Sequence, residues 1–204
     1  MNFCFQENKY QWLARIYVKI GGNTLGVCGG TLVASKYVIT AAQCTFGVYI
    51  GYSLELSADE IFVRIGDHDQ DPSINFDPIK VKTINRHPDF DIASLINNIA
   101  ILELEEEVDL NVYATACIAT EADATTFDGE TATVVGWGST EPIAVGVPPS
   151  QDPQDYPTVP HEVDVPVIPA DSCIFNGNTA PNSIICTGSE DGGKGPCYVR
   201  LNSL

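Results

Sequence analysis

Residues 28–32 are CGGTL and residues 37–44 are YVITAAQC, and this stretch decides the fold. Each half holds a short run of β-branched and apolar residues close to glycine or alanine, which is typical of a strand rather than a helix. A cysteine stands at either end of the stretch, Cys28 and Cys44. The pattern predicts two short strands, at residues 31–34 and 37–40.

Short apolar runs of the same kind continue along the whole chain, between clusters of Gly, Pro, Asn and Asp. They predict an all-β barrel or sandwich protein. Only two segments, 91–96 and 169–175, suggest a short turn of helix. The polar residues 120–128 predict a connection between two β units, and the proline-rich residues 140–160 predict a long exposed loop. The further predicted strands are 12–20, 61–65, 79–84, 99–104, 132–135, 162–167 and 183–186.

Composition narrows the class of protein. A chain of 204 residues suits one or two domains, and its 44% hydrophobic content is enough for a packed core. The formal net charge of −17 repels nucleic acid, so that partner is set aside, and it favours solubility. No apolar run is long enough to span a membrane as a helix.

The seven cysteines contain no C-x-x-C pair, which favours disulfides over a zinc site. Disulfides imply an oxidising, extracellular compartment, and an odd count leaves one thiol without an internal partner. The first twelve residues carry neither a basic start nor an apolar segment typical of a secretion signal. We therefore expect the sequence to be incomplete at its N-terminus.

The opening stretch strongly resembles the chymotrypsin/trypsin serine protease family, whose pattern is C-G-G-[ST]-L … V-[LI]-T-A-A-H-C. The resemblance covers roughly residues 10–198. Within the family, the sequence is similar to the arthropod-type trypsin-like proteases. It implies two antiparallel β-barrels, at residues 10–118 and 129–204, with the second barrel incomplete because the family continues with further strands and a helix. The other matching segments are 86–88 (RHP), 97–102 (NNIAIL), 134–138 (VVGWG), 162–168 (EVDVPVI) and 185–188 (ICTG).

The family needs a Ser nucleophile, a His base and an Asp that orients the His. Gln43 stands at the His position, and its amide has no nitrogen that titrates near neutral pH. Asn98 stands at the Asp position, where it keeps the shape of the side chain and loses the charge. The motifs on either side fix both positions, so the resemblance predicts loss of catalysis.

The Ser position allows two alignments, and neither supplies a serine. The spacing of the last two cysteines places Leu201 at the nucleophile, Gly195 at the base of the specificity pocket and Arg200 at the Asp that pairs with the activated N-terminus. The alternative aligns the Gly-Pro pair at 195–196 and places Gly193 at the nucleophile. The sequence also lacks the I-V-G-G activation start, which agrees with the loss of its partner.

The resemblance also assigns roles to the cysteines, histidines and two acidic residues. It gives the histidines structural or surface roles, and it suggests a calcium site at Asp67 and Asp77, for which an acidic solvated loop is the alternative. No other cofactor is implied. The implied disulfides are Cys28–Cys44, Cys173–Cys186 and Cys4–Cys117, with Cys197 left over, and the histidines are His68, His87 and His161.

The sequence therefore predicts a secreted, catalytically inactive serine protease homologue, a pseudoenzyme that acts through contacts with proteins such as active proteases or their substrates. One alternative is an active secreted serine endopeptidase represented by a fragmentary or mis-spliced sequence. Gln43 and Asn98 argue against it, because both lie inside intact motifs. A further alternative is a broken copy without function.

Overall fold

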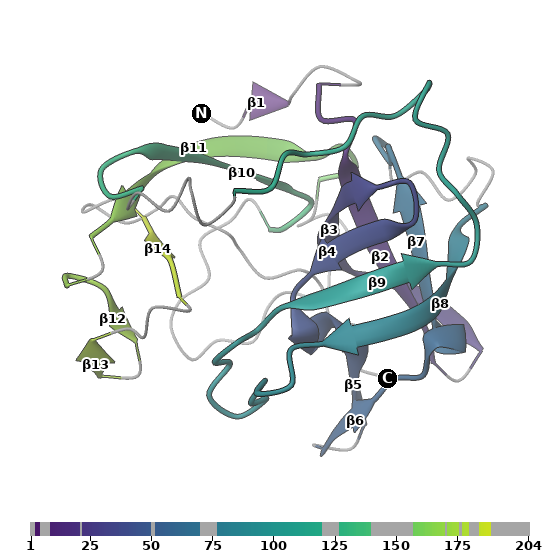
Figure 1. Cartoon of the computed structure of the whole chain (residues 1–204), viewed down its shortest axis with the longest axis horizontal. Helices are drawn as coiled ribbons and strands as arrows, with labels where there is room; N and C mark the ends of the chain where they lie inside the picture. Colours follow the sequence, from purple (N-terminus) through teal and green to yellow (C-terminus); the bar gives the residue numbers. More distant parts are fainter. Residues whose placement is uncertain are drawn as a thin grey trace. The chain divides into compact units, whose positions relative to one another are not determined.

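The computed structural model describes residues 3–4, 9–20, 22–49, 52–69, 77–119, 127–139, 157–169, 171–175, 177–179 and 184–188. They form two compact units (Figure 1). The first unit lies within Gln6–Ile118, and the second combines residues within Ala119–Val199 with the strand β1 (Phe3–Cys4). Nearly all regular structure in the described residues is strand, which confirms the predicted all-β class. None of these residues belongs to a helix that could cross a membrane.

Six antiparallel strands of the first unit close into a barrel, in the order β2-β3-β4-β9-β8-β7. Pairing of β2 with β7 completes the closure, with Ile16 opposite Val63. The structure confirms the first barrel that the family resemblance implied. Its strands are β2 (Leu13–Ile20), β3 (Asn23–Ala34), β4 (Tyr37–Thr40), β7 (Ile61–Ile65), β8 (Ile79–Arg86) and β9 (Ala100–Leu104).

The barrel core follows from the two-residue period of the strands. β7 and β9 each bury their first, third and fifth residues and turn the other two outward. Burying one large aliphatic side chain contributes about 1.5–3 kcal/mol, so the alternation fixes which face of each strand points inward. The core cluster includes Ala14, Ile16, Val18, Leu32, Val38, Ile61, Val63, Ile65, Val81, Leu102 and Leu104.

Two glycines of the first unit are required by close packing. A Cβ at Gly30 would lie 2.8 Å from Val38 Cγ1, so only glycine allows this approach of β3 to β4. Gly66 has a positive φ of 67°, and a Cβ there would lie 2.5 Å from Tyr113 Cε1. The chain can therefore turn sharply after β7 only with glycine at position 66.

Several short elements were not predicted. They are the 3₁₀ turns η1 (Ala42–Thr45) and η2 (Ala58–Glu60) and the hairpin of β5 (Phe46–Tyr49) with β6 (Tyr52–Glu55). The predicted turn at 91–96 is present, and the Leu95 N–H closes it by donating to Asp91 O at 2.7 Å. The predicted turn at 169–175 was wrong at its end, because Ile174–Phe175 forms strand β12, paired with β13 (Asn178–Thr179).

The second unit is built around β11 (His161–Ile168), which pairs antiparallel with β10 (Thr131–Gly136), β1 and β14 (Cys186–Thr187). Val165, Trp137 and Cys173 are buried in this unit. Its described strands do not close into a barrel, in agreement with the predicted incomplete second barrel. The predicted loop at 140–160 lies outside the described residues except for its last four, 157–160.

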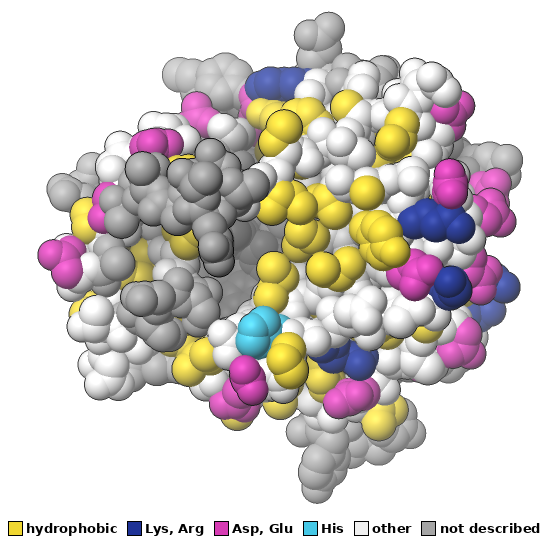
Figure 2. Space-filling view, in the orientation of Figure 1, with side chains coloured by type: hydrophobic (Ala, Val, Ile, Leu, Met, Phe, Trp, Pro, Cys, Tyr) yellow, Lys and Arg dark blue, Asp and Glu magenta, His cyan; other side chains and the backbone are white. Residues whose placement is uncertain are grey.

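Apolar side chains also lie on the outside of the first unit. Figure 2 shows hydrophobic side chains gathered on the face of this unit, with charged side chains around them. Tyr37 of β4, Ile101 of β9 and Ile99 just before β9 are 42%, 40% and 44% exposed. Tyr37 and Ile101 point away from the core on neighbouring strands, so with Ile99 they give the barrel an exposed apolar surface.

Candidate functional site

Gln43 lies in η1, which follows shortly after β4. The chain is attached to β3 on both sides of Gln43, at Thr40 and at Cys44. The Thr40 hydroxyl donates to the Gly29 carbonyl at 2.8 Å. Cys44 forms a disulfide with Cys28 across a sequence separation of 16 residues. A loop of this length contributes about 3 kcal/mol through the entropy of the unfolded chain. The backbone that presents Gln43 is therefore fixed by the barrel.

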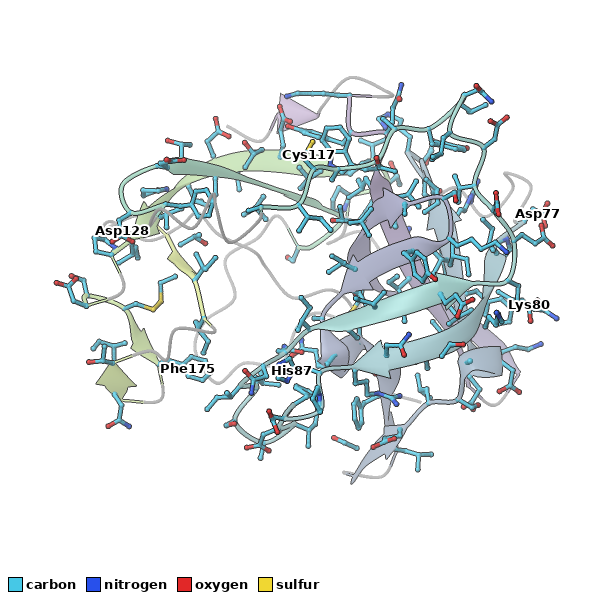
Figure 3. All side chains as sticks on the ribbon, in the orientation of Figure 1. Asp77, Lys80, His87, Cys117, Asp128 and Phe175 are labelled. Atoms are coloured by element: carbon cyan, nitrogen blue, oxygen red, sulfur yellow. A yellow bond between two sulfur atoms is a disulfide. The ribbon has the colours of Figure 1, made fainter. Side chains whose placement is uncertain are left out.

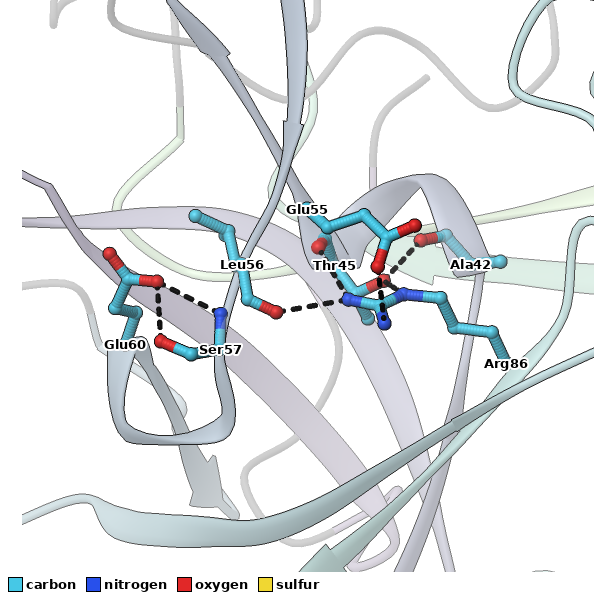
Figure 4. A network of polar contacts seen from close by, with 7 residues as sticks. All are labelled: Ala42, Thr45, Glu55, Leu56, Ser57, Glu60 and Arg86. Atoms are coloured by element: carbon cyan, nitrogen blue, oxygen red, sulfur yellow. Dashed lines mark hydrogen bonds and ion pairs between the residues drawn. The ribbon is translucent and has the colours of Figure 1, made fainter.

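Arg86, at the end of β8, holds the same turn from the other side (Figure 4). Its Nε donates to Thr45 Oγ1 at 2.6 Å, and its Nη2 donates to the carbonyls of Thr45 and Leu56 at 3.1 and 3.0 Å. The Thr45 hydroxyl donates in turn to Ala42 O at 2.7 Å. Thr45 is completely buried, so water cannot reach its polar groups, and these bonds supply their partners instead.

Asn98 stands at the end of the connection between β8 and β9. Asn97, with a φ of 57°, donates from Nδ2 to Asp89 O at 3.0 Å. The Ser94 hydroxyl donates to Asp91 Oδ2 at 2.6 Å, and this bond is the main cause that lowers the pKa of the Asp91 carboxyl. The connection is thus ordered by its own polar contacts before it reaches Asn98.

Gln43 and Asn98 are joined by two hydrogen bonds. The backbone N–H of Gln43 donates to Asn98 Oδ1 at 2.9 Å. Asn98 Nδ2 donates to Gln43 Oε1, also at 2.9 Å. Because a backbone N–H can only donate, it fixes Oδ1 of Asn98 on its side, and the Nδ2 donor must then face the Gln43 side chain.

The polarity of this pair is opposite to that of a His–Asp pair. In a catalytic triad, the carboxylate accepts a hydrogen bond from the imidazole Nδ1–H and so orients the base toward the nucleophile. Here the residue at the carboxylate position donates, and the residue at the base position accepts with an amide oxygen. Neither amide gains or loses a proton near neutral pH, so the pair has no general base.

His87 is the first residue of the connection between β8 and β9 (Figure 3). Its Nδ1 accepts a hydrogen bond from the backbone N–H of Asp89 at 3.1 Å. That contact gives the ring a structural role in the turn. His68 and His161 are half-buried, and their structural roles remain predictions.

The predictions about the nucleophile fall beyond the described part of the chain. Leu201, its alternative Gly193, and the associated Gly195, Arg200 and Cys197 all lie outside the described residues. Of the three residues that the resemblance placed at the triad positions, Gln43 and Asn98 are described, and two hydrogen bonds join them. The described part of the site therefore consists of Gln43 and Asn98, the residues at the positions of the base and of the residue that orients it.

Two of the implied disulfides are present. Besides Cys28–Cys44, Cys173 is bonded to Cys186 in the second unit. Cys117 is exposed, and it is bonded to none of the cysteines whose side chains the structure describes (Figure 3). The side chain of Cys4 lies outside the described residues, so its pairing with Cys117 remains a prediction.

Asp67 does not fit the calcium site that the resemblance suggested. Its carboxylate is buried, accepts a hydrogen bond from the Tyr17 hydroxyl at 2.6 Å and forms an ion pair with Arg64 at 3.2 Å. Burial, followed by the hydrogen bond to Asp67, raises the pKa of Tyr17 to about 12. Asp77 is exposed, and no group of three or more potential metal ligands occurs among the described residues.

Comparison with known proteins agrees with the barrel and the motifs. Residues 4–198 match the Trypsin family. The chain is 32% identical over 199 residues to serine protease filzig of Drosophila melanogaster, covering 95% of this chain and 11% of that protein. It is 29% identical to the proclotting enzyme of Tachypleus tridentatus and to trypsin 5G1 of Aedes aegypti, covering 92% and 83% of this chain.

These matches cover only part of the related proteins, 49% of the proclotting enzyme and 57% of trypsin 5G1. The match to the family extends over nearly the whole of this chain, and it includes the closed barrel as well as the segments around Gln43 and Asn98. The chain therefore belongs to the trypsin family of serine proteases.

Proposed function

We propose that this chain is a catalytically inactive member of the trypsin family that acts through contacts with other proteins. The observation that carries the proposal is the double hydrogen bond between Gln43 and Asn98. It replaces the His–Asp pair of an active protease by two neutral amides whose donor and acceptor are reversed. The active relatives' chemistry needs a base at the position that Gln43 occupies.

The expected loss of activity is large. Removing the base or the nucleophile of a catalytic triad lowers kcat by on the order of 10⁶, because the members act as a unit. In this chain an amide, that of Gln43, stands at the position of the base. One alignment places Leu201 at the position of the nucleophile and the other places Gly193 there, so neither supplies a serine. The remaining binding groups could not restore a useful rate, since proton transfer from the nucleophile has no acceptor.

Three features support a role in protein contacts. The apolar surface that includes Tyr37, Ile99 and Ile101 is of the kind that proteins use to bind one another. A net charge of −17 disfavours nucleic acid as a partner. The two disulfides favour secretion into an oxidising compartment, where active trypsin-like proteases and their protein substrates would be available as partners.

Two assays test the proposal. The chain alone, offered a panel of peptide substrates at pH 8, should show no turnover above background, and Gln43→Ala should give the same result. Added to an active trypsin-like protease, the chain should change cleavage of a protein substrate and leave cleavage of a small peptide unchanged. Turnover by the chain itself, lost in Gln43→Ala, would favour the alternative of an active endopeptidase.

A further inference from the structure

Asp67 lies just past the end of β7, at the seam where β7 pairs with β2 to close the barrel. The residue is 4% exposed, and its side chain is 1% exposed. A carboxylate buried to this extent needs partners that compensate its charge. The described neighbours that supply them come from both strands of the seam.

Each carboxylate oxygen of Asp67 faces a cationic or donor group. The Tyr17 hydroxyl donates to Oδ2 at 2.6 Å, and Arg15 Nη1 lies 3.9 Å from the same oxygen. Arg64 Nη1 lies 3.2 Å from Oδ1, to which no aligned hydrogen bond is made within the described structure. The charge of Oδ1 is therefore balanced by the ion pair with Arg64.

The register of the seam explains why these groups meet. Arg15 on β2 stands directly opposite Arg64 on β7. Two like charges at directly opposed positions of an antiparallel pair destabilise the sheet. The Asp67 carboxylate contacts both guanidinium groups and so offsets their repulsion at the point of barrel closure. The two arginines and the carboxylate depend on one another.

We infer that guanidinium groups take the place of a metal ion at Asp67, and that the first unit is held at this point by Arg64, Arg15 and Tyr17 without calcium. Calcium binds six to eight oxygen ligands in a site with net negative charge. Here one carboxylate stands against two guanidinium groups, so the local formal charge is already positive and would repel a divalent cation.

The first test is thermal unfolding of the whole chain in excess chelator and in about 10 mM calcium chloride, some tenfold above the dissociation constant of weak extracellular calcium sites. We expect the two melting temperatures to agree within about 1 °C, because a ligand that does not bind the folded state cannot stabilise it. A rise of several degrees in calcium, lost in Asp67→Asn, would overturn the inference.

The second test perturbs the cluster in calcium-free buffer. Asp67→Asn leaves Arg15 and Arg64 facing each other and should lower the melting temperature by about 5 °C or more. Asp77→Asn, at an exposed carboxylate, is the matched control and should leave it unchanged. If Asp67→Asn does not fold, Tyr17→Phe, which removes only the donor to Oδ2, takes its place and should lower the melting temperature by a smaller amount.

A thermodynamic cycle separates the cluster from a general loss of packing. The double variant Asp67→Asn with Arg64→Ala removes the repelling charge together with the carboxylate. We expect its melting temperature to lie above the value obtained by adding the two single effects, because the residues interact directly. Additive effects, or no effect of Asp67→Asn, would show that Asp67 does not balance the arginines.

Discussion

The Gln43→His substitution tests the reversed polarity of the amide pair. In this variant the backbone N–H of residue 43 is unchanged and still fixes Asn98 Oδ1. Asn98 Nδ2 then points at the introduced imidazole, as it points at Gln43 Oε1 in the unchanged chain. We therefore expect the ring to accept at Nδ1 and to carry its proton at Nε2.

The size of the effect follows from the bond that Asn98 would have to give up. Protonating Nδ1 places two donors face to face unless the Asn98 amide turns over, and turning over breaks its bond from the backbone N–H. A bond of this kind contributes about 0.5–1.5 kcal/mol. Since one pKa unit corresponds to about 1.4 kcal/mol, the pKa of the introduced imidazole should fall from about 6.5 to about 5.4–6.1.

The matched control adds Asn98→Asp to Gln43→His. A carboxylate accepts from both the backbone N–H and the Nδ1–H of the ring, so the proton moves to Nδ1 and the pKa of the imidazole should rise above about 7. In active family members, an Asn at this position reduces kcat by about 10⁴ because it selects the wrong tautomer. Gln43→His alone should therefore remain inactive.

Nuclear magnetic resonance of nitrogen-labelled protein distinguishes the two tautomers and follows the titration. The three natural histidines supply internal reference signals. An Nδ1–H tautomer in Gln43→His with Asn98 intact would refute the reasoning. An equal pKa in the single and double variants would refute it as well.

Two further predictions concern the support of the site. Arg86→Ala should lower the free energy of unfolding, measured by urea denaturation, by about 3 kcal/mol or more, because buried oxygens of Thr45 lose their donors. Lys82→Ala, in an exposed ion pair, is the control and should leave the urea midpoint unchanged. Equal urea midpoints for the two variants would contradict this account. Replacing Cys28 and Cys44 together by serine should cost about 3 kcal/mol in the same assay, and an unchanged midpoint would show that the disulfide adds nothing to the barrel.

The barrel could be predicted because local pattern and motif agree. Alternating apolar residues mark strands such as β7 and β9, and Gly30 of the opening motif stands where a Cβ would collide. The hairpin of β5 and β6 escaped prediction because it forms a separate two-stranded sheet, and the described side chains of β6, Ser53, Leu54 and Glu55, are all exposed. Leu54 in this hairpin is 62% exposed. These three residues therefore show no two-residue period of burial.

The site was predictable in its positions and not in its contacts. Flanking motifs place Gln43 and Asn98, but which amide donates is decided by a backbone N–H 55 residues away in sequence. The contacts of Asp67 could not be predicted from the sequence for a similar reason. Its partners Tyr17 and Arg15 lie on another strand, about 50 residues earlier, and only the closed barrel brings them to the carboxylate.

The central claim is that the chain lacks a nucleophile and a base that act together. A fluorophosphonate probe tests it directly, because the probe labels only a serine that is activated for attack. Intact chain, incubated with the probe at pH 8 beside an active trypsin as positive control and analysed by mass spectrometry, should carry no label above that of the heat-denatured chain. Stoichiometric label on one serine of the folded chain, absent after denaturation, would contradict the account.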